Sequence, residues 1–170
     1  MANEMKTMET ELVKAYRKKD PESFERRELI FRMLAVMVGS RVLYSILFVG
    51  YALAGGIVVP GIQYVMLLVM VAVALAFAKF IYSAGIKYAA YIGIGGGVYS
   101  LLMAYGDGTF HAIGAVDAFL SAVLGMLVIS AVIQIAVMAF IAFDNKCKLY
   151  MSVMAEIRRD LLKYAGGNLR

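Results

Sequence analysis

Long apolar runs alternate with short polar or glycine-rich stretches along this chain. Each run is close to the roughly 20 residues that a helix needs to cross a hydrocarbon core of about 30 Å. The stretches between them, "GGIVVPG", "SAGI" and "GDGTF", carry the glycine or proline that interrupts helices. Short links make neighbouring helices antiparallel. The pattern predicts an all-α, polytopic integral membrane protein with four antiparallel transmembrane helices, at Met33–Ala54, Ile62–Tyr82, Lys87–Tyr105 and Asp117–Phe143.

Amphipathic helices are predicted at both ends of the chain. The N-terminal region carries apolar positions at three- and four-residue steps, followed by "DPES", in which Asp20 can cap a second helix. After Phe143 a second stripe has the same helical spacing. Its members are Tyr150, Met154, Ile157, Leu161 and Tyr164. Three interpretations of this stripe are open: packing against the N-terminal helix, which is the favoured one, docking on a partner protein, for which these residues are the candidates, and contact with anionic lipid.

Composition and charge place the middle of the chain in a bilayer and both ends in the cytosol. Hydrophobic residues make up 62% of the sequence, well above the roughly 45–50% of soluble domains. Most of the 17 basic residues lie before position 29, after position 143 or beside the second connector, at Lys79 and Lys87. Cytoplasmic loops retain positive charge. We therefore expect cytoplasmic regions 1–28 and 144–170 around a membrane domain 29–143, in a cell membrane that we take to be a bacterial plasma membrane.

Small residues recur at three- or four-residue steps in two places, and this spacing is typical of helix contacts in lipid. Because lipid offers little hydrophobic drive for helix association, close backbone approach carries the packing. The first set is Gly85, Ala89, Gly93 and Gly97; the second is Gly114, Ala118, Ser121 and Gly125. We expect the first set to contact another helix, either in this chain or in a second copy. The second set is the surface that we expect to pack against it.

Arg41 is the one guanidinium deep inside an apolar run. A central arginine costs roughly 2.5–3.5 kcal/mol on insertion scales, which the surrounding Leu, Ile, Val and Phe residues offset at about 0.3–0.6 kcal/mol each. Tyr44 and Ser45 lie on the same helical face. Three interpretations remain open: the side chain snorkels to cytoplasmic phosphates, makes a buried structural bond, or lies on the path of an ion or anionic substrate.

The outer end of the predicted bundle holds the other polar candidates. Asp117 is the candidate acidic partner of Arg41, although it lies at the opposite end of its span, and it can alternatively cap the last span. His111 would meet Asp117 only if residues 107–117 bend, and these residues can form either a loop or a helix extension. Gln134, deep in the last span, is expected to hydrogen-bond between helices.

The sequence carries no visible catalytic or metal-binding chemistry. One cysteine, Cys147, and one histidine cannot form an internal disulfide or a zinc site. Neither HExxH nor GxSxG occurs, and "GIGGGV" lacks the context of a nucleotide loop. We expect no enzyme activity, no cofactor and no nucleic acid partner.

Two function classes follow from these features. The first is a non-enzymatic, membrane-embedded subunit or accessory of a larger envelope or transport complex, with lipid and a protein partner or a second copy as its contacts. The alternative is a homo-oligomeric channel or small transporter. In that case Arg41, Tyr44, Ser45, His111 and Asp117 would line the path of the ion or substrate.

Overall fold

The computed structural model describes residues 2–167, and the side chains of residues 7–163, as helices joined by short connectors. Within these residues there are no strands. The elements in chain order are α1 (Ala2–Lys19), the 3-10 helix η1 (Glu22–Phe24), α2 (Arg27–Ala54), α3 (Gly61–Tyr82), α4 (Lys87–Gly106), α5 (Thr109–Ala112), α6 (Ala118–Phe143) and α7 (Asn145–Gly167). The predicted all-α class is confirmed.

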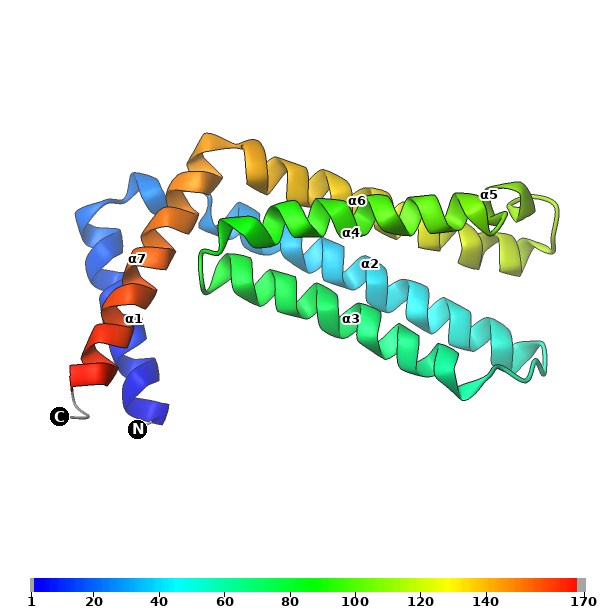
Figure 1. The fold of residues 1–170 in the computed structure, drawn as a ribbon, viewed down its shortest axis with the longest axis horizontal. Helices are drawn as coiled ribbons and strands as arrows, with labels where there is room; N and C mark the ends of the chain where they lie inside the picture. The colour runs from blue at the N-terminus through cyan, green and yellow to red at the C-terminus, as the bar shows by residue number, and fades with distance from the viewer. Residues whose placement is uncertain (1, 168–170) are drawn as a thin grey trace.

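Four long helices form an antiparallel bundle. Figure 1 shows α2, α3, α4 and α6 running side by side, with α1 and α7 packed against one another at one end. We call that end the base and the opposite end, with the connectors after α2 and α4, the tip. The closest neighbours are α4 with α6, α2 with α6, and α2 with α3. The bundle therefore consists of a tightly packed side around α6 and a more open side around α3.

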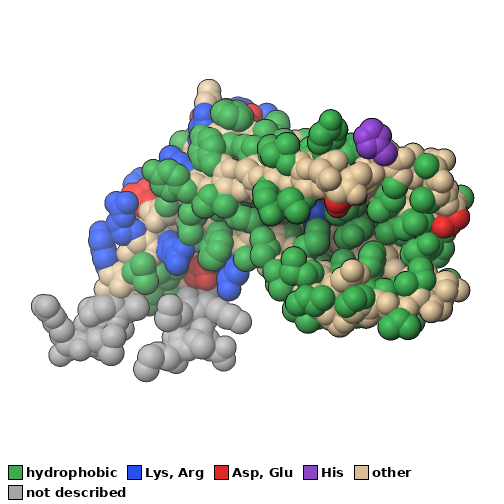
Figure 2. Space-filling model, turned by 45° about the vertical axis from the view of Figure 1, so that its right-hand side comes forward, with side chains coloured by type: hydrophobic (Ala, Val, Ile, Leu, Met, Phe, Trp, Pro, Cys, Tyr) green, Lys and Arg blue, Asp and Glu red, His purple; other side chains and the backbone are tan. Residues whose placement is uncertain are grey.

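Three of the described helical segments are long and apolar enough to cross a membrane. They are Glu22–Ala54, Gly61–Tyr82 and Ala118–Phe143. The helix α4 is not among them, because its glycines and tyrosines lower the hydropathy of an otherwise apolar segment. Hydrophobic side chains cover the bundle in Figure 2, whereas the Lys and Arg side chains gather mostly at the base. These features agree with a membrane location.

The base is closed by contacts between α7 and the rest of the chain. The Tyr16 hydroxyl of α1 donates to Oδ2 of Asp160 on α7 at 2.9 Å. Lys146 Nζ lies 2.6 Å from Oε2 of Glu25, in the turn that precedes α2. The Tyr150 hydroxyl donates to the backbone oxygen of Tyr82 at the end of α3, at 2.8 Å. These three links attach α7 to α1, to the turn before α2 and to the end of α3.

The helix that Asp20 is predicted to cap does not run into α2 without a break. Asp20 accepts hydrogen bonds from the backbone N–H and the hydroxyl of Ser23, as a capping residue does. The chain then makes only the short η1 segment before α2 begins at Arg27. Phe24 from η1 is buried edge-to-face against Tyr150, with ring centroids 5.9 Å apart. This contact places η1 against α7.

Candidate functional site

A buried polar chain joins three helices of the bundle. Arg41 on α2 is 3% exposed, and its Nη2 donates to Oε1 of Gln134 on α6 at 2.9 Å. The Gln134 amide nitrogen in turn donates to the backbone oxygen of Gly93 on α4 at 2.7 Å. In an apolar setting each of these bonds satisfies a group that is costly to leave unpaired. The chain therefore fixes the relative positions of α2, α6 and α4.

Two glycines on α4, Gly93 and Gly97, leave the space in which these hydrogen bonds form. A Cβ at Gly97 would lie 2.6 Å from Cγ1 of Ile135 and 3.2 Å from the backbone oxygen of Ala131. A Cβ at Gly93 would lie 2.8 Å from Cγ of Met138. Close approach of α4 and α6 brings the Gly93 carbonyl, which has a second lone pair beyond its helical bond, within reach of Gln134.

One nitrogen of the Arg41 guanidinium remains unpaired. Nη1 is buried without a hydrogen-bond partner among the residues that the structure describes. A buried charge of this kind costs several kcal/mol unless it is compensated. Arg41 is therefore the buried charge of the bundle that calls for a functional or architectural reason.

Tyr44 and Ser45 lie beside Arg41 but do not bind its guanidinium. Tyr44 is 9% exposed and packs against Phe48, with ring centroids 6.3 Å apart. The Ser45 hydroxyl donates to the backbone oxygen of Arg41 at 3.0 Å. Sequence reasoning recognised the polar face and the bonding capacity of Gln134, but it considered Asp117 rather than Gln134 as the partner of Arg41.

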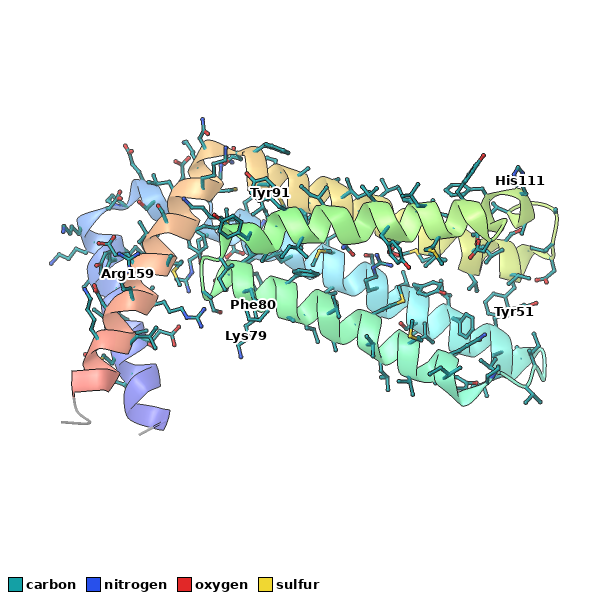
Figure 3. The ribbon with its side chains drawn as sticks, viewed as in Figure 1. Tyr51, Lys79, Phe80, Tyr91, His111 and Arg159 are labelled. Carbon is teal, nitrogen blue, oxygen red and sulfur yellow. The ribbon has the colours of Figure 1, made fainter. Side chains whose placement is uncertain are left out.

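His111 and Asp117 lie at the tip and are not brought together with Arg41. Oδ1 of Asp117 accepts from the backbone N–H groups of Phe119 and Leu120 at 3.0 and 2.9 Å, so Asp117 caps α6. The Tyr51 hydroxyl donates to its Oδ2 at 3.4 Å. His111, in the short α5, is exposed at the far end of the bundle (Figure 3). The five predicted path residues therefore do not form one continuous line.

The two sets of small residues have different surroundings. Ala89, Gly93 and Gly97 are buried on α4, and the two glycines face α6. Gly85 precedes α4, in the turn after α3, and its backbone approaches α7 instead. The prediction that the second set packs against the first is wrong. Gly114 lies in a loop, Ala118 is exposed, Ser121 accepts from the Gly114 N–H at 2.9 Å, and a Cβ at Gly125 would meet nothing within 4 Å.

The reason for this error is the register between the two helices. Because α4 and α6 are antiparallel, Gly93 and Gly97, in the basal half and at the middle of α4, meet the basal half of α6 rather than its beginning. The residues that face them are Ala131, Gln134, Ile135 and Met138. A sequence pattern gives the face of a helix but not its displacement along the neighbour.

The predicted docking stripe on α7 is covered by this chain. Tyr150, Met154 and Ile157 are between 0% and 5% exposed. They share one core with residues of α2, α3 and α6, and Leu12, Val13, Tyr16 and Leu161 pack on its edge. The docking prediction is therefore corrected to intramolecular packing for the residues up to Leu161. The side chain of Tyr164 lies outside the described residues.

A lateral groove follows α2 and α3 for most of their length. Its tip half has a volume of about 710 Å³ and is lined only by residues of these two helices, including Ser45, Ile46, Gly50 and Leu68. Its basal half has a volume of about 510 Å³ and adds Lys79 and Ser83 to an otherwise apolar lining. The groove exists because α3 buries only Leu67, Ala74 and Ile81, one residue every second turn.

Within the described residues, no group of three His, Cys, Asp or Glu side chains could hold a metal ion. No family model, no curated protein and no solved structure matches this chain.

Proposed function

We propose that this chain is a four-span, non-enzymatic integral membrane protein that serves as a membrane-embedded subunit or accessory of a larger envelope or transport complex. In this proposal both termini are cytoplasmic. The observation that carries the proposal is the groove between α2 and α3, whose tip half of about 710 Å³ is apolar and open to the side of the bundle.

Four spans are favoured by the position of α4. This helix lies along α6, an apolar helix of 26 residues, and its 20 residues would cover about 30 Å at 1.5 Å per residue. Its outward residues include Ile92 and Leu102, which suit contact with lipid. The positive charge gathered at the base favours a cytoplasmic base.

The tip half of the groove suits a transmembrane helix of another protein. Helices associate in lipid by close packing rather than by the hydrophobic effect, so a preformed concave surface with small residues favours association. Ser45 and Gly50 supply the small residues, and Ile46, Leu53 and Leu68 supply apolar walls. An acyl chain also fits an apolar groove, and position-specific photocrosslinking separates these two occupants.

Position-specific photocrosslinking tests the proposal. A photoreactive residue at Ile46, in the groove, should give a discrete adduct with a different protein in intact membranes. The same residue at Ile92 is a matched control, because the two side chains are 61% and 63% exposed and Ile92 lies on α4. Leu68→Trp should abolish the Ile46 adduct by filling the groove, whereas Leu102→Trp should leave it unchanged. An adduct with lipid only, or equal adducts from both positions, would contradict the proposal.

A homo-oligomeric channel or small transporter is the second candidate, because the buried Nη1 of Arg41 is unpaired. Such a protein should move an ion or anionic solute across liposomes. Flux that persists in the Arg41→Ala, Asp117→Asn double variant would remove these residues from the path. Absence of flux in the unmodified protein would remove the class.

A further inference from the structure

A second pocket adjoins the basal half of the groove and shares two residues with it. This pocket, of about 400 Å³, lies where α3 meets α7, and Arg158 and Leu161 contribute to it from α7. Lys79 and Ser83 line both this pocket and the groove. Figure 3 shows Lys79 on the side of α3 that faces away from the body of the bundle, near the base. An apolar groove and a basic pocket therefore meet at one lysine.

The pocket has the charge needed to hold an anion. Lys79 and Arg158 each carry a positive charge, and Glu9 on α1 supplies the one carboxylate, so the ionised lining residues sum to +1. Among the described residues neither Lys79 nor Arg158 forms an ion pair. The Ser83 hydroxyl adds a neutral donor beside them. Two unpaired cations and a hydroxyl provide charge-assisted hydrogen bonds for a phosphate.

The adjoining groove has the length and lining of an acyl-chain site. On α2 it extends from Phe31 to Gly39, and the eight helical steps between them rise about 12 Å at 1.5 Å per residue. One leaflet is about half of a 30 Å hydrocarbon core. Leu34 and Leu75 are among the apolar residues that line it. The groove thus extends through most of one leaflet, starting from the level of Lys79.

We propose that this junction binds one anionic phospholipid, with its phosphate between Lys79 and Arg158 and an acyl chain in the basal half of the groove. The lipid belongs to the leaflet at the base, which is the cytoplasmic leaflet in the topology proposed above. A free phosphate would gain only the basic pocket, whereas a phospholipid gains both surfaces at once. The inference requires α2 and α3 to lie in a bilayer but requires no protein partner.

Native mass spectrometry of the full chain in detergent tests the headgroup position. Dioleoyl phosphatidylglycerol should bind more tightly than dioleoyl phosphatidylcholine, which has the same chains. Lys79→Gln and Arg158→Gln should each weaken phosphatidylglycerol binding by about fivefold, as expected for loss of one basic group near an anionic headgroup. Lys87→Gln and Arg159→Gln should leave binding unchanged, because neither residue lines the two pockets. Equal binding of the two lipids, or equal losses in test and control variants, would overturn the proposal.

A second pair of variants tests the acyl chain. Gly39→Leu should weaken binding of both lipids, because a side chain there enters the groove, and a Cβ at this position meets nothing within 4 Å. Gly95→Leu is the control, since a Cβ at Gly95 also meets nothing within 4 Å and α4 does not line the groove. Glycerol 3-phosphate at millimolar concentration should not displace the lipid. Displacement by it, or unchanged binding in Gly39→Leu, would show that the acyl chain is not held as proposed.

Discussion

The α4–α6 contact and the α2–α3 contact differ in how closely their two helices pack. Between α4 and α6, Gly93 and Gly97 let the backbones approach closely, and Gln134 adds a hydrogen bond across the contact. Between α2 and α3, by contrast, α3 buries only Leu67, Ala74 and Ile81, and grooves of about 710 and 510 Å³ remain. Since close packing carries helix association in lipid, the first contact is suited to stability and the second leaves surface for a ligand.

Cys147 gives the largest expected effect and a probe of both contacts. Its thiol is buried at the base, and burial, reinforced by Asp144, raises its pKa from 9.0 to about 12. Because the thiolate is the reactive form, iodoacetamide at pH 8 should label the folded protein about a thousandfold more slowly than the SDS-unfolded chain. Because the pKa of this thiol is higher in the folded protein than in the unfolded chain, its contribution to the free energy of unfolding is complete below pH 9. That contribution is lost as the pH rises toward 12.

This thiol reports on the comparison because its core contains Met37, Ile81 and Ile141, from α2, α3 and α6. Substitutions that loosen the α4–α6 contact should speed labelling, whereas substitutions that fill the groove should not. Rapid labelling of the unmodified folded protein would contradict the burial on which this test depends.

Gly97→Leu should cause the largest loss of stability. The first added carbon would already lie 2.6 Å from Ile135 Cγ1, and the Ala131 carbonyl on the other side cannot retreat without moving α6. Overpacking of this kind costs about 3 kcal/mol. Thermal unfolding in detergent, followed by circular dichroism, measures the loss. Gly95→Leu adds the same side chain to open space on the same helix, and equal losses in both variants would show that α4 and α6 do not meet as described.

Gln134→Leu should cost about 2 kcal/mol, because it removes a hydrogen bond to a charged group and leaves Arg41 buried without a partner. In the background of Arg41→Met, which removes the buried charge, the same substitution should cost under about 1 kcal/mol. A double-mutant cycle of unfolding free energies measures the difference. Additive losses would mean that the two side chains do not interact.

Ile46→Trp should have the smallest effect, under about 0.5 kcal/mol, because Ile46 is 61% exposed and faces the groove. Ile92→Trp on α4 should behave alike. The same thermal unfolding assay compares them. A large loss from Ile46→Trp alone would indicate that the groove is closed in the folded protein and would remove the distinction between the two contacts.

The sequence was sufficient for the features that depend on local spacing. Apolar runs and their glycine or proline breaks located the long helices, and α3 was placed within one residue of its observed bounds. The end of α6 at Phe143 and the capping role open to Asp117 also follow from neighbouring residues. The helical face of Tyr150, Met154 and Ile157 was correctly recognised as apolar.

The features that were missed depend on how distant helices align. The bond between Arg41 and Gln134 joins residues 93 positions apart, and it requires the register of α2 against α6. The mate of Gly93 and Gly97 requires the register of α4 against α6. An apolar face on α7 does not identify its occupant, because α1, the bundle and a partner protein all offer apolar surface. The groove was missed because it is defined by separation between α2 and α3 rather than by any residue type.

The turn at Gly85 has a consequence for the order of biosynthesis. Its φ of +61° and its contact with α7, where a Cβ would lie 2.1 Å from the Met151 carbonyl oxygen, place this turn directly beneath a helix made later. The ribosome adds 66 residues between positions 85 and 151, which takes about 3–13 s at 5–20 residues per second. During those seconds the hairpin of α3 and α4 has no cover at its base. Docking of α7 is thus a late assembly step, and its contacts with the base can form only after the earlier helices have been inserted.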